Sequence, residues 1–275
     1  MALVVLEIPS EDTLNEESYL AANPDIRAAG MGALDHFLKH GKEEGRQQFT
    51  QQYLNTQHSY RAEKFKKFAH ILKLDDRNSL IETFPISIGN EHFDISDYAT
   101  ESANPGFGPF HKELETNPDQ LYLDIGCGFR NIVYPNCLYL EVYPSRTADI
   151  LVAPTCLYPI KSSSLDGIGC FAVLEHTRKP WLVVQEIQRM LKPGGRAFID
   201  WPFLQPVHGF PSHFFNATRE GLCSLFEDSG FSIEYSGTGP HQTPAYTVQW
   251  ILREMLAQLP EGCAKESFRN INTQA

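Results

Sequence analysis

Short apolar runs recur along the chain from residue 120 onward, and polar, glycine or proline positions bound each of them. Such runs have the length of buried strands, and they fall near residues 120–124, 138–142, 149–153, 167–172, 196–201 and 231–236. Apolar residues recur at helical spacing near 180–191, 218–229 and 245–259. Strands that alternate with helices predict an α/β fold, in which a parallel sheet carries helices on both faces.

The first connection of this sheet is unusually short. Only nine residues, with Pro135 among them, lie between Gly128 and Leu138, so the helix of an ordinary parallel crossover is predicted to shrink to a turn or two. After the strand near 231–236 no convincing partner strand follows, so the last strand is either missing or supplied in an unusual way.

Residues 12–46 have the pattern of a helical hairpin. Thr13 and Glu16 have the spacing of a capping box at the start of its first helix. Pro24 suits the first position of a second helix, and Gly30 is placed to end it.

Residues 51–73 are predicted to form a basic amphipathic helix. Its cations are Arg61, Lys64, Lys66, Lys67 and Lys73. Two surfaces suit such a helix: a membrane, or an acidic domain of the same chain, whose local negative charge it would offset.

The chain therefore divides into three parts. Residues 1–75 form a helical appendage, and residues 119–275 form the α/β domain. Residues 76–118 are rich in proline and glycine with little periodicity, which predicts a connector that could act as a lid.

Composition limits the classes of function. The 275 residues carry a formal net charge of −11, which argues against a nucleic-acid backbone as partner. No apolar run reaches the roughly 18 residues needed to span a bilayer, and the first residues lack the basic leader of a signal peptide. The six cysteines contain no C-x-x-C pair, so free thiols and a cytoplasmic protein are expected.

The strongest chemical signal is a glycine turn after the first apolar run. The run ends in Asp124-Ile125-Gly126-Cys127-Gly128, and the next run ends in a second carboxylate, Glu141. This spacing is typical of a fold that holds an adenosine. Glycines let the backbone approach the ligand, and the second acid accepts hydrogen bonds from the ribose hydroxyls.

The order of motifs after this turn resembles that of class I S-adenosylmethionine-dependent methyltransferases, type 11 branch. The matching motifs are Leu-Asp-Ile-Gly-Cys-Gly at 123–128, Val-Leu-Glu-His at 173–176 and Leu-Lys-Pro-Gly-Gly at 191–195. The resemblance covers about residues 120–236, and the segments 202–209 and 213–218 resemble a bacterial subgroup with a short first helix. It implies a Rossmann-like sheet and S-adenosyl-L-methionine as cofactor.

The resemblance also implies cofactor contacts. Asp124 belongs to the loop that positions the methionine end of the cofactor, and Glu141 binds the ribose. The full expected set is Asp124, Gly126, Cys127, Gly128, Glu141, Thr155, Cys156, Leu157 and Glu175. Backbone near 155–157 is expected at the adenine, because Pro154 stands where the family often places an acid.

Arg130 stands where many relatives have a third glycine. It either pairs with the cofactor carboxylate or an anionic acceptor, or is a solvent-exposed arginine.

Three histidines are candidates for the acceptor side. His176 follows the fourth strand, where it could orient an acceptor, act as a base, or bond a loop carbonyl. His208 and His213 lie in the loop after the fifth strand among Phe203 and Phe214, which is typical of either a small-molecule pocket or a hydrophobic lid. A histidine can deprotonate a hydroxyl or an amine at neutral pH. No metal is predicted, because no two histidine or cysteine ligands share a helix face at metal spacing.

Residues 19–46 resemble a small helical module attached to bacterial glycan-modifying enzymes, and this module could dock another protein or a second copy of the chain. We therefore expect an enzyme that methylates a small-molecule or glycan-linked acceptor, with oxygen as the target atom. The alternatives are a non-catalytic module in a glycan-assembly complex and a nicotinamide-dependent oxidoreductase. The fingerprint of nicotinamide-dependent enzymes contains a third glycine, which this chain lacks.

Overall fold

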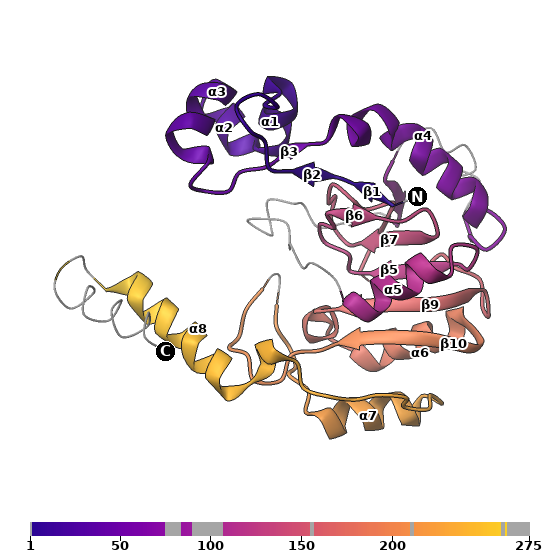
Figure 1. Cartoon of the computed structure of the whole chain (residues 1–275). Helices are drawn as coiled ribbons and strands as arrows, with labels where there is room; N and C mark the ends of the chain where they lie inside the picture. The colour runs from indigo at the N-terminus through magenta and orange to yellow at the C-terminus, as the bar shows by residue number, and fades with distance from the viewer. Residues whose placement is uncertain are drawn as a thin grey trace. The chain divides into compact units, whose positions relative to one another are not determined.

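The computed structural model describes residues 2–74, 84–89, 107–154, 157–209, 212–259 and 262. Its centre is a six-stranded parallel sheet flanked by helices, which confirms the predicted α/β fold (Figure 1). The order across the sheet is β10-β9-β5-β7-β8-β4. The strands are β4 (Ile86–Ile88), β5 (Tyr122–Ile125), β7 (Cys137–Glu141), β8 (Ile150–Val152), β9 (Leu165–Phe171) and β10 (Leu191–Asp200).

The sheet is Rossmann-like in its strand order. Apart from β4 at one edge, the order is that of a doubly wound fold, with the chain reversing direction across the sheet between β5 and β9. Strand β5 pairs in parallel with both neighbours, with Leu123 opposite Leu138 and Ile168. Residues on both faces of β5 are buried, as parallel sheets require.

Two compact units make up the chain. The first comprises Met1–Phe171 and Met190–Phe198, and the second comprises Ala172–Arg189 and Ile199–Ala275. In the first unit, α5 (Gly108–Thr116) packs Phe110 against the rings of Tyr122, Phe171 and Phe198 on one sheet face. Both α5 and β4 lie in the range predicted as a connector, where the sequence indicated no element.

The first crossover contains no helix. Residues 126–136 join β5 to β7 through a short strand, β6 (Ile132–Val133), which pairs with β1 (Leu3–Val4). The predicted reduction of the helix is therefore complete.

The N-terminal segment is helical and carries short strands. Its helices are α1 (Glu16–Ala22), α2 (Pro24–Ala28) and α3 (Ala33–His36), followed by a π-helical turn Phe37–Gly41. Strands β2 (Leu6–Glu7) and β3 (Gln48–Phe49) pair with each other. Tyr19, Ala33 and Phe37 form its small core. The predicted capping box is wrong: Asn15 caps α1 by accepting from the Ser18 amide, because Thr13 bonds the Ser10 amide instead.

The basic helix α4 (Gln51–Phe68) lies against the sheet of its own unit, so the second of its two predicted surfaces is correct. Its Lys64 donates to Asp149 Oδ2 at 2.7 Å, and both side chains are at most 2% exposed. The same oxygen accepts from the Tyr139 amide of β7, and Lys64 also lies 4.7 Å from the centre of the Tyr139 ring. This buried ion pair joins the helix to the strand edge.

The second unit contains α6 (Pro180–Met190, whose last residue belongs to the first unit), α7 (Arg219–Asp228), α8 (Pro244–Gln258) and the short 3-10 turns Leu174–His176 and Pro240–Gln242. The predicted strand at 231–236 is wrong, because these residues pair with no strand in the described part of the chain. No described helix is long and apolar enough to cross a membrane.

Replacing Lys64 should reveal how much of the fold depends on the buried pair. Lys64→Met leaves the Asp149 carboxylate buried with only Arg61 Nε, 3.6 Å from its other oxygen, as an opposing cation. We expect the free energy of unfolding to fall by about 3–5 kcal/mol, measured by urea denaturation followed by circular dichroism. The matched control is Lys66→Met on the same helix, whose pair with Glu63 is about 70% exposed and should contribute less than about 1 kcal/mol. Equal losses in the two variants would contradict this account.

Candidate functional site

The turn after β5 approaches the end of β7 closely. Gly126 and Gly128 have φ values of 64° and 52°, in the left-handed region that favours glycine. The amides of Gly126 and Cys127 both donate to the Leu140 carbonyl, at 2.8 and 3.1 Å. These bonds hold the turn against the end of β7.

Glu141 closes this turn from the end of β7. Its Oε1 accepts from the Gly128 amide at 2.9 Å, and its Oε2 accepts from the Val142 amide at 2.6 Å. Burial raises the pKa of Glu141 to about 7, although the two amide bonds oppose the shift. A carboxylate has about four acceptor sites, so two remain for a ligand such as a ribose diol.

Asp124 and Arg130 form a buried ion pair beneath the same turn. Arg130 donates through Nε to Asp124 Oδ2 at 2.8 Å and through Nη2 to Oδ1 at 3.2 Å. Because Arg130 is only 2% exposed, the prediction of a solvent-exposed arginine is wrong. The guanidinium instead holds the turn onto the end of β5, so Asp124 acts by positioning the turn.

Thr147 completes the support of the turn, and the sequence did not single it out. Its hydroxyl donates to the Gly128 carbonyl at 3.0 Å and accepts from the Arg130 amide at 3.1 Å. The sequence gives little indication of this role, since a threonine between two strands can have many other structural roles. Cys127 is fully buried, and burial raises the pKa of its thiol, so it is an unreactive packing residue.

The predicted adenine contacts are only partly visible. Leu157 is 76% exposed, while Thr155 and Cys156 lie outside the described residues. Their assignment to adenine stays a prediction.

In the second unit, the three predicted histidines lie together. The ring centres of His176 and His208 are 5.6 Å apart, as are those of His176 and His213, and His208 lies 4.7 Å from His213. Burial lowers the pKa of His176 and of His208, and the neighbouring histidines act in the same direction. Both imidazoles are therefore neutral at pH 7.

The hydrogen bonds of the three rings differ. His176 Nδ1 lies 2.8 Å from the Ser212 carbonyl, and His208 Nδ1 lies 2.8 Å from the Pro206 carbonyl. His213 uses both nitrogens, since Nδ1 accepts from the His208 amide and Nε2 bonds Asn216 Oδ1. His213 thus supports the loop, which is the turn-capping alternative, whereas His176 and His208 each keep Nε2 for other chemistry.

Glu175 lies in the second unit with the three histidines, whereas the glycine turn lies in the first unit. Its carboxylate is completely buried, and neither oxygen has a hydrogen-bond partner among the described residues. Burial raises the pKa of Glu175 to about 8. Its predicted contact with the cofactor stays a prediction.

Aromatic side chains accompany the histidines. Phe203 and Phe214 are about 40% exposed, which suits either a pocket wall or a lid. The ring of Trp250, on α8, lies 5.2 Å from the His208 ring. Sequence reasoning missed Trp250, because a tryptophan in an ordinary amphipathic helix has no distinguishing signal.

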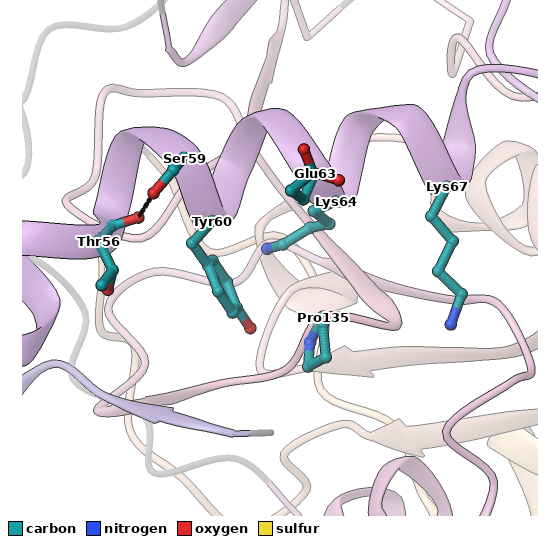
Figure 2. Close-up of a pocket in the computed structure, with 7 residues that line it drawn as sticks. All are labelled: Thr56, Ser59, Tyr60, Glu63, Lys64, Lys67 and Pro135. Carbon is teal, nitrogen blue, oxygen red and sulfur yellow. Dashed lines mark hydrogen bonds between the residues drawn. The ribbon is translucent and has the colours of Figure 1, made fainter.

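A separate hollow of about 340 Å³ lies beside α4. Figure 2 shows Tyr60 and Lys67 extending from the helix on the side of Pro135. Its polar groups are already used, since Tyr60 donates to the Val133 carbonyl and Lys67 to the Pro118 carbonyl. We therefore assign it no chemistry.

Comparison with solved structures finds partial likenesses. A structure titled as the complex between the Haloferax volcanii Trm112 methyltransferase activator and the putative methyltransferase matches at 16% identity, with a TM-score of 0.32, over 40% of this chain and 61% of that one. An S-adenosylmethionine-dependent methyltransferase from Mesorhizobium loti matches at 14% identity, with a TM-score of 0.34, over 47% and 81%. A Haemonchus contortus phosphoethanolamine N-methyltransferase matches at 16% identity, with a TM-score of 0.37, over 58% and 44%.

These likenesses are too low to assign a function. The chain spans only 61% of the length of the Haloferax volcanii structure. No curated protein matched the chain. Residues 123–199, which run from β5 through β10 and include the glycine turn, Glu141 and Glu175-His176, match the family Methyltransf_11, described as a methyltransferase domain.

Proposed function

We propose that the chain transfers a methyl group from S-adenosyl-L-methionine to a small-molecule or glycan-linked acceptor, with oxygen as the methylated atom. The observation that carries the proposal is the pairing of the Gly126–Gly128 turn with Glu141, inside the segment that matches a methyltransferase domain. Gly126 and Gly128 have no side chains that would keep a ligand away from the backbone, and Glu141 has two remaining acceptor sites.

The cofactor would lie along the carboxyl end of β5. Ligands of open α/β sheets bind at this edge, where the strand order reverses. The ribose hydroxyls would donate to Glu141, and the methionine end would follow the turn that Asp124, Arg130 and Thr147 hold in place. Methyl transfer then needs an acceptor atom in line with the sulfonium, in a site that excludes water.

The acceptor side would use the histidine cluster. His208 and His176 are neutral and keep Nε2 unbonded among the described residues, so either can remove a proton from an acceptor hydroxyl. Trp250 and the neighbouring phenylalanines supply apolar surface for the acceptor.

A second candidate is a non-catalytic module that keeps the fold. Two observations favour it: no described strand follows β10, and Arg130 occupies the Asp124 carboxylate. Binding of the cofactor without any methyl transfer would identify this case.

Gly128→Val should abolish binding of S-adenosylhomocysteine, because valine disfavours a φ of 52° and its side chain would stand where the ligand approaches. Isothermal titration of the full chain measures the affinity. Gly45→Val is the matched control, since Gly45 has a φ of 65° with no atom near its added Cβ, and it lies far along the chain in the N-terminal segment. Unchanged affinity in a folded Gly128→Val variant would remove this turn as the site.

Cofactor affinity should depend on the ionisation of Glu141. The carboxylate is charged above its pKa of about 7, and only the charged form accepts at all of its oxygen lone pairs. The affinity for S-adenosylhomocysteine should therefore be greatest above pH 7 and fall by up to about tenfold for each pH unit below it. Glu141→Gln should bind more weakly, with no such dependence between pH 6 and 8. A wild-type affinity that is flat over this range would contradict the ribose assignment.

His208→Ala should leave S-adenosylhomocysteine affinity intact and lower turnover by about 10²–10⁴-fold. Turnover is followed as tritium transfer from methyl-labelled S-adenosylmethionine to a panel of free sugars and oligosaccharides. His241→Ala is the control, because His241 bonds Asp200 and lies outside the cluster of three histidines. If His208→Ala and His176→Ala both transfer at the wild-type rate, the cluster does not serve the acceptor.

A further inference from the structure

Three side chains of the second unit bring metal-ligating atoms close together. One carboxylate oxygen of Glu175 and one ring nitrogen each of His176 and His208 lie within 4.8 Å of one another. Glu175 Oε1 is 3.8 Å from His176 Nε2, which is too long for a hydrogen bond. Ligands bound at about 2.0–2.2 Å to a common zinc ion lie about 3.3 Å apart. Small side-chain rotations would therefore complete a coordination sphere.

The tautomers of the two histidines are those of metal ligands. A carbonyl oxygen accepts only from an N–H, so the bonds to Ser212 and Pro206 place the proton of each neutral ring on Nδ1. The Nε2 lone pair of each ring is then available. A ligating histidine nearly always donates its other nitrogen to a carbonyl or carboxylate in this way.

Glu175 supplies ligand oxygens that no other described residue bonds. Both of its carboxylate oxygens are buried without a hydrogen-bond partner. A buried carboxylate needs a cation or donors to offset its lost hydration. A metal ion between Glu175 and the two imidazoles would be that partner.

The surrounding loop is held in register with the three ligands. The Phe214 amide donates to the Glu175 carbonyl at 2.7 Å, and the Asn216 amide group donates to the Gln205 carbonyl at 2.9 Å. Gly209, with a φ of 75°, lies against His176, since a Cβ there would come within 2.4 Å of the ring. The loop that carries His208 is thus fixed to the turn that carries Glu175 and His176.

We propose that Glu175, His176 and His208 form a two-histidine, one-carboxylate site for a divalent transition-metal ion such as Zn²⁺, Fe²⁺ or Co²⁺. Imidazole with a carboxylate suits these ions, and three protein ligands leave open positions for water or a substrate oxygen. His213 is a supporting residue, because both of its ring nitrogens are already bonded.

This site departs from the prediction of no metal. That prediction searched for ligand pairs on one helix face, whereas these ligands come from a 3-10 turn and from a loop 32 residues later in the chain. The proposal stands without methyl transfer. If methyl transfer holds, the ion would also bind the acceptor hydroxyl and lower its pKa, so that water could accept the proton in place of the imidazoles, whose Nε2 atoms would be bound to the ion.

Zinc titration of the chelator-treated full chain tests the site directly. We expect one ion bound per chain by isothermal titration, and an absorption band from Co²⁺ that saturates at the same ratio. His208→Gln and Glu175→Gln should each weaken binding by at least about 100-fold, since loss of even an outer hydrogen-bond partner weakens it by 10–100-fold. His241→Gln, a histidine of the same unit outside the cluster, should bind like the wild type.

The proposal is overturned if the wild-type chain binds no zinc, or if a folded His208→Gln variant binds it with wild-type affinity. His208 lies on a half-buried loop, so this variant provides the test even if Glu175→Gln unfolds. The titrations contain no cofactor. Absence of zinc binding with S-adenosylhomocysteine binding intact would overturn the metal site alone, and the reverse result would overturn the cofactor site alone.

Discussion

Two buried aspartates of the first compact unit each pair with a buried cation, and these two pairs determine where α4 and the first crossover lie. Asp149 meets Lys64, and Asp124 meets Arg130, with almost no side-chain exposure in either pair. A buried charge without its partner is strongly destabilising, although a paired one adds little over an apolar pair. Such pairs therefore select one arrangement of the chain more than they increase its stability.

The two departures from an ordinary doubly wound fold follow from these pairs. Lys64 lies 85 residues before Asp149, so satisfying that carboxylate brings α4 onto the sheet. Arg130 lies only six residues after Asp124, so satisfying the second carboxylate folds the first crossover back on β5. The folded-back crossover takes the place of an ordinary first helix, which a third glycine would pack against the strand.

Local patterns in the sequence predicted the features that local physics determines. Apolar runs marked five of the sheet's strands, and the glycines marked the turn with its positive φ values. The run at 231–236 failed because a strand also needs a neighbour, which no run of residues encodes. Partners distant in sequence were likewise missed. Lys64 could not be distinguished from the four other cations of its predicted helix. Strand β4 has only three residues, which is too short to be recognised from an apolar pattern. Arg130 was noticed, but its partner depended on the shape of the turn.

Glu175 lacks the kind of partner that Asp124 and Asp149 have. No arginine or lysine of the described chain is bonded to it, and two neutral imidazoles with available Nε2 atoms lie beside it. Imidazoles whose Nδ1 atoms carry the proton present lone pairs, so they cannot donate to a carboxylate through Nε2. Without a cation, burial keeps Glu175 protonated at pH 7, because its pKa is raised to about 8; a bound cation would replace that proton and be shared by three electron-pair donors. The proposed metal ion would give Glu175 the kind of partner that Lys64 gives Asp149 and Arg130 gives Asp124.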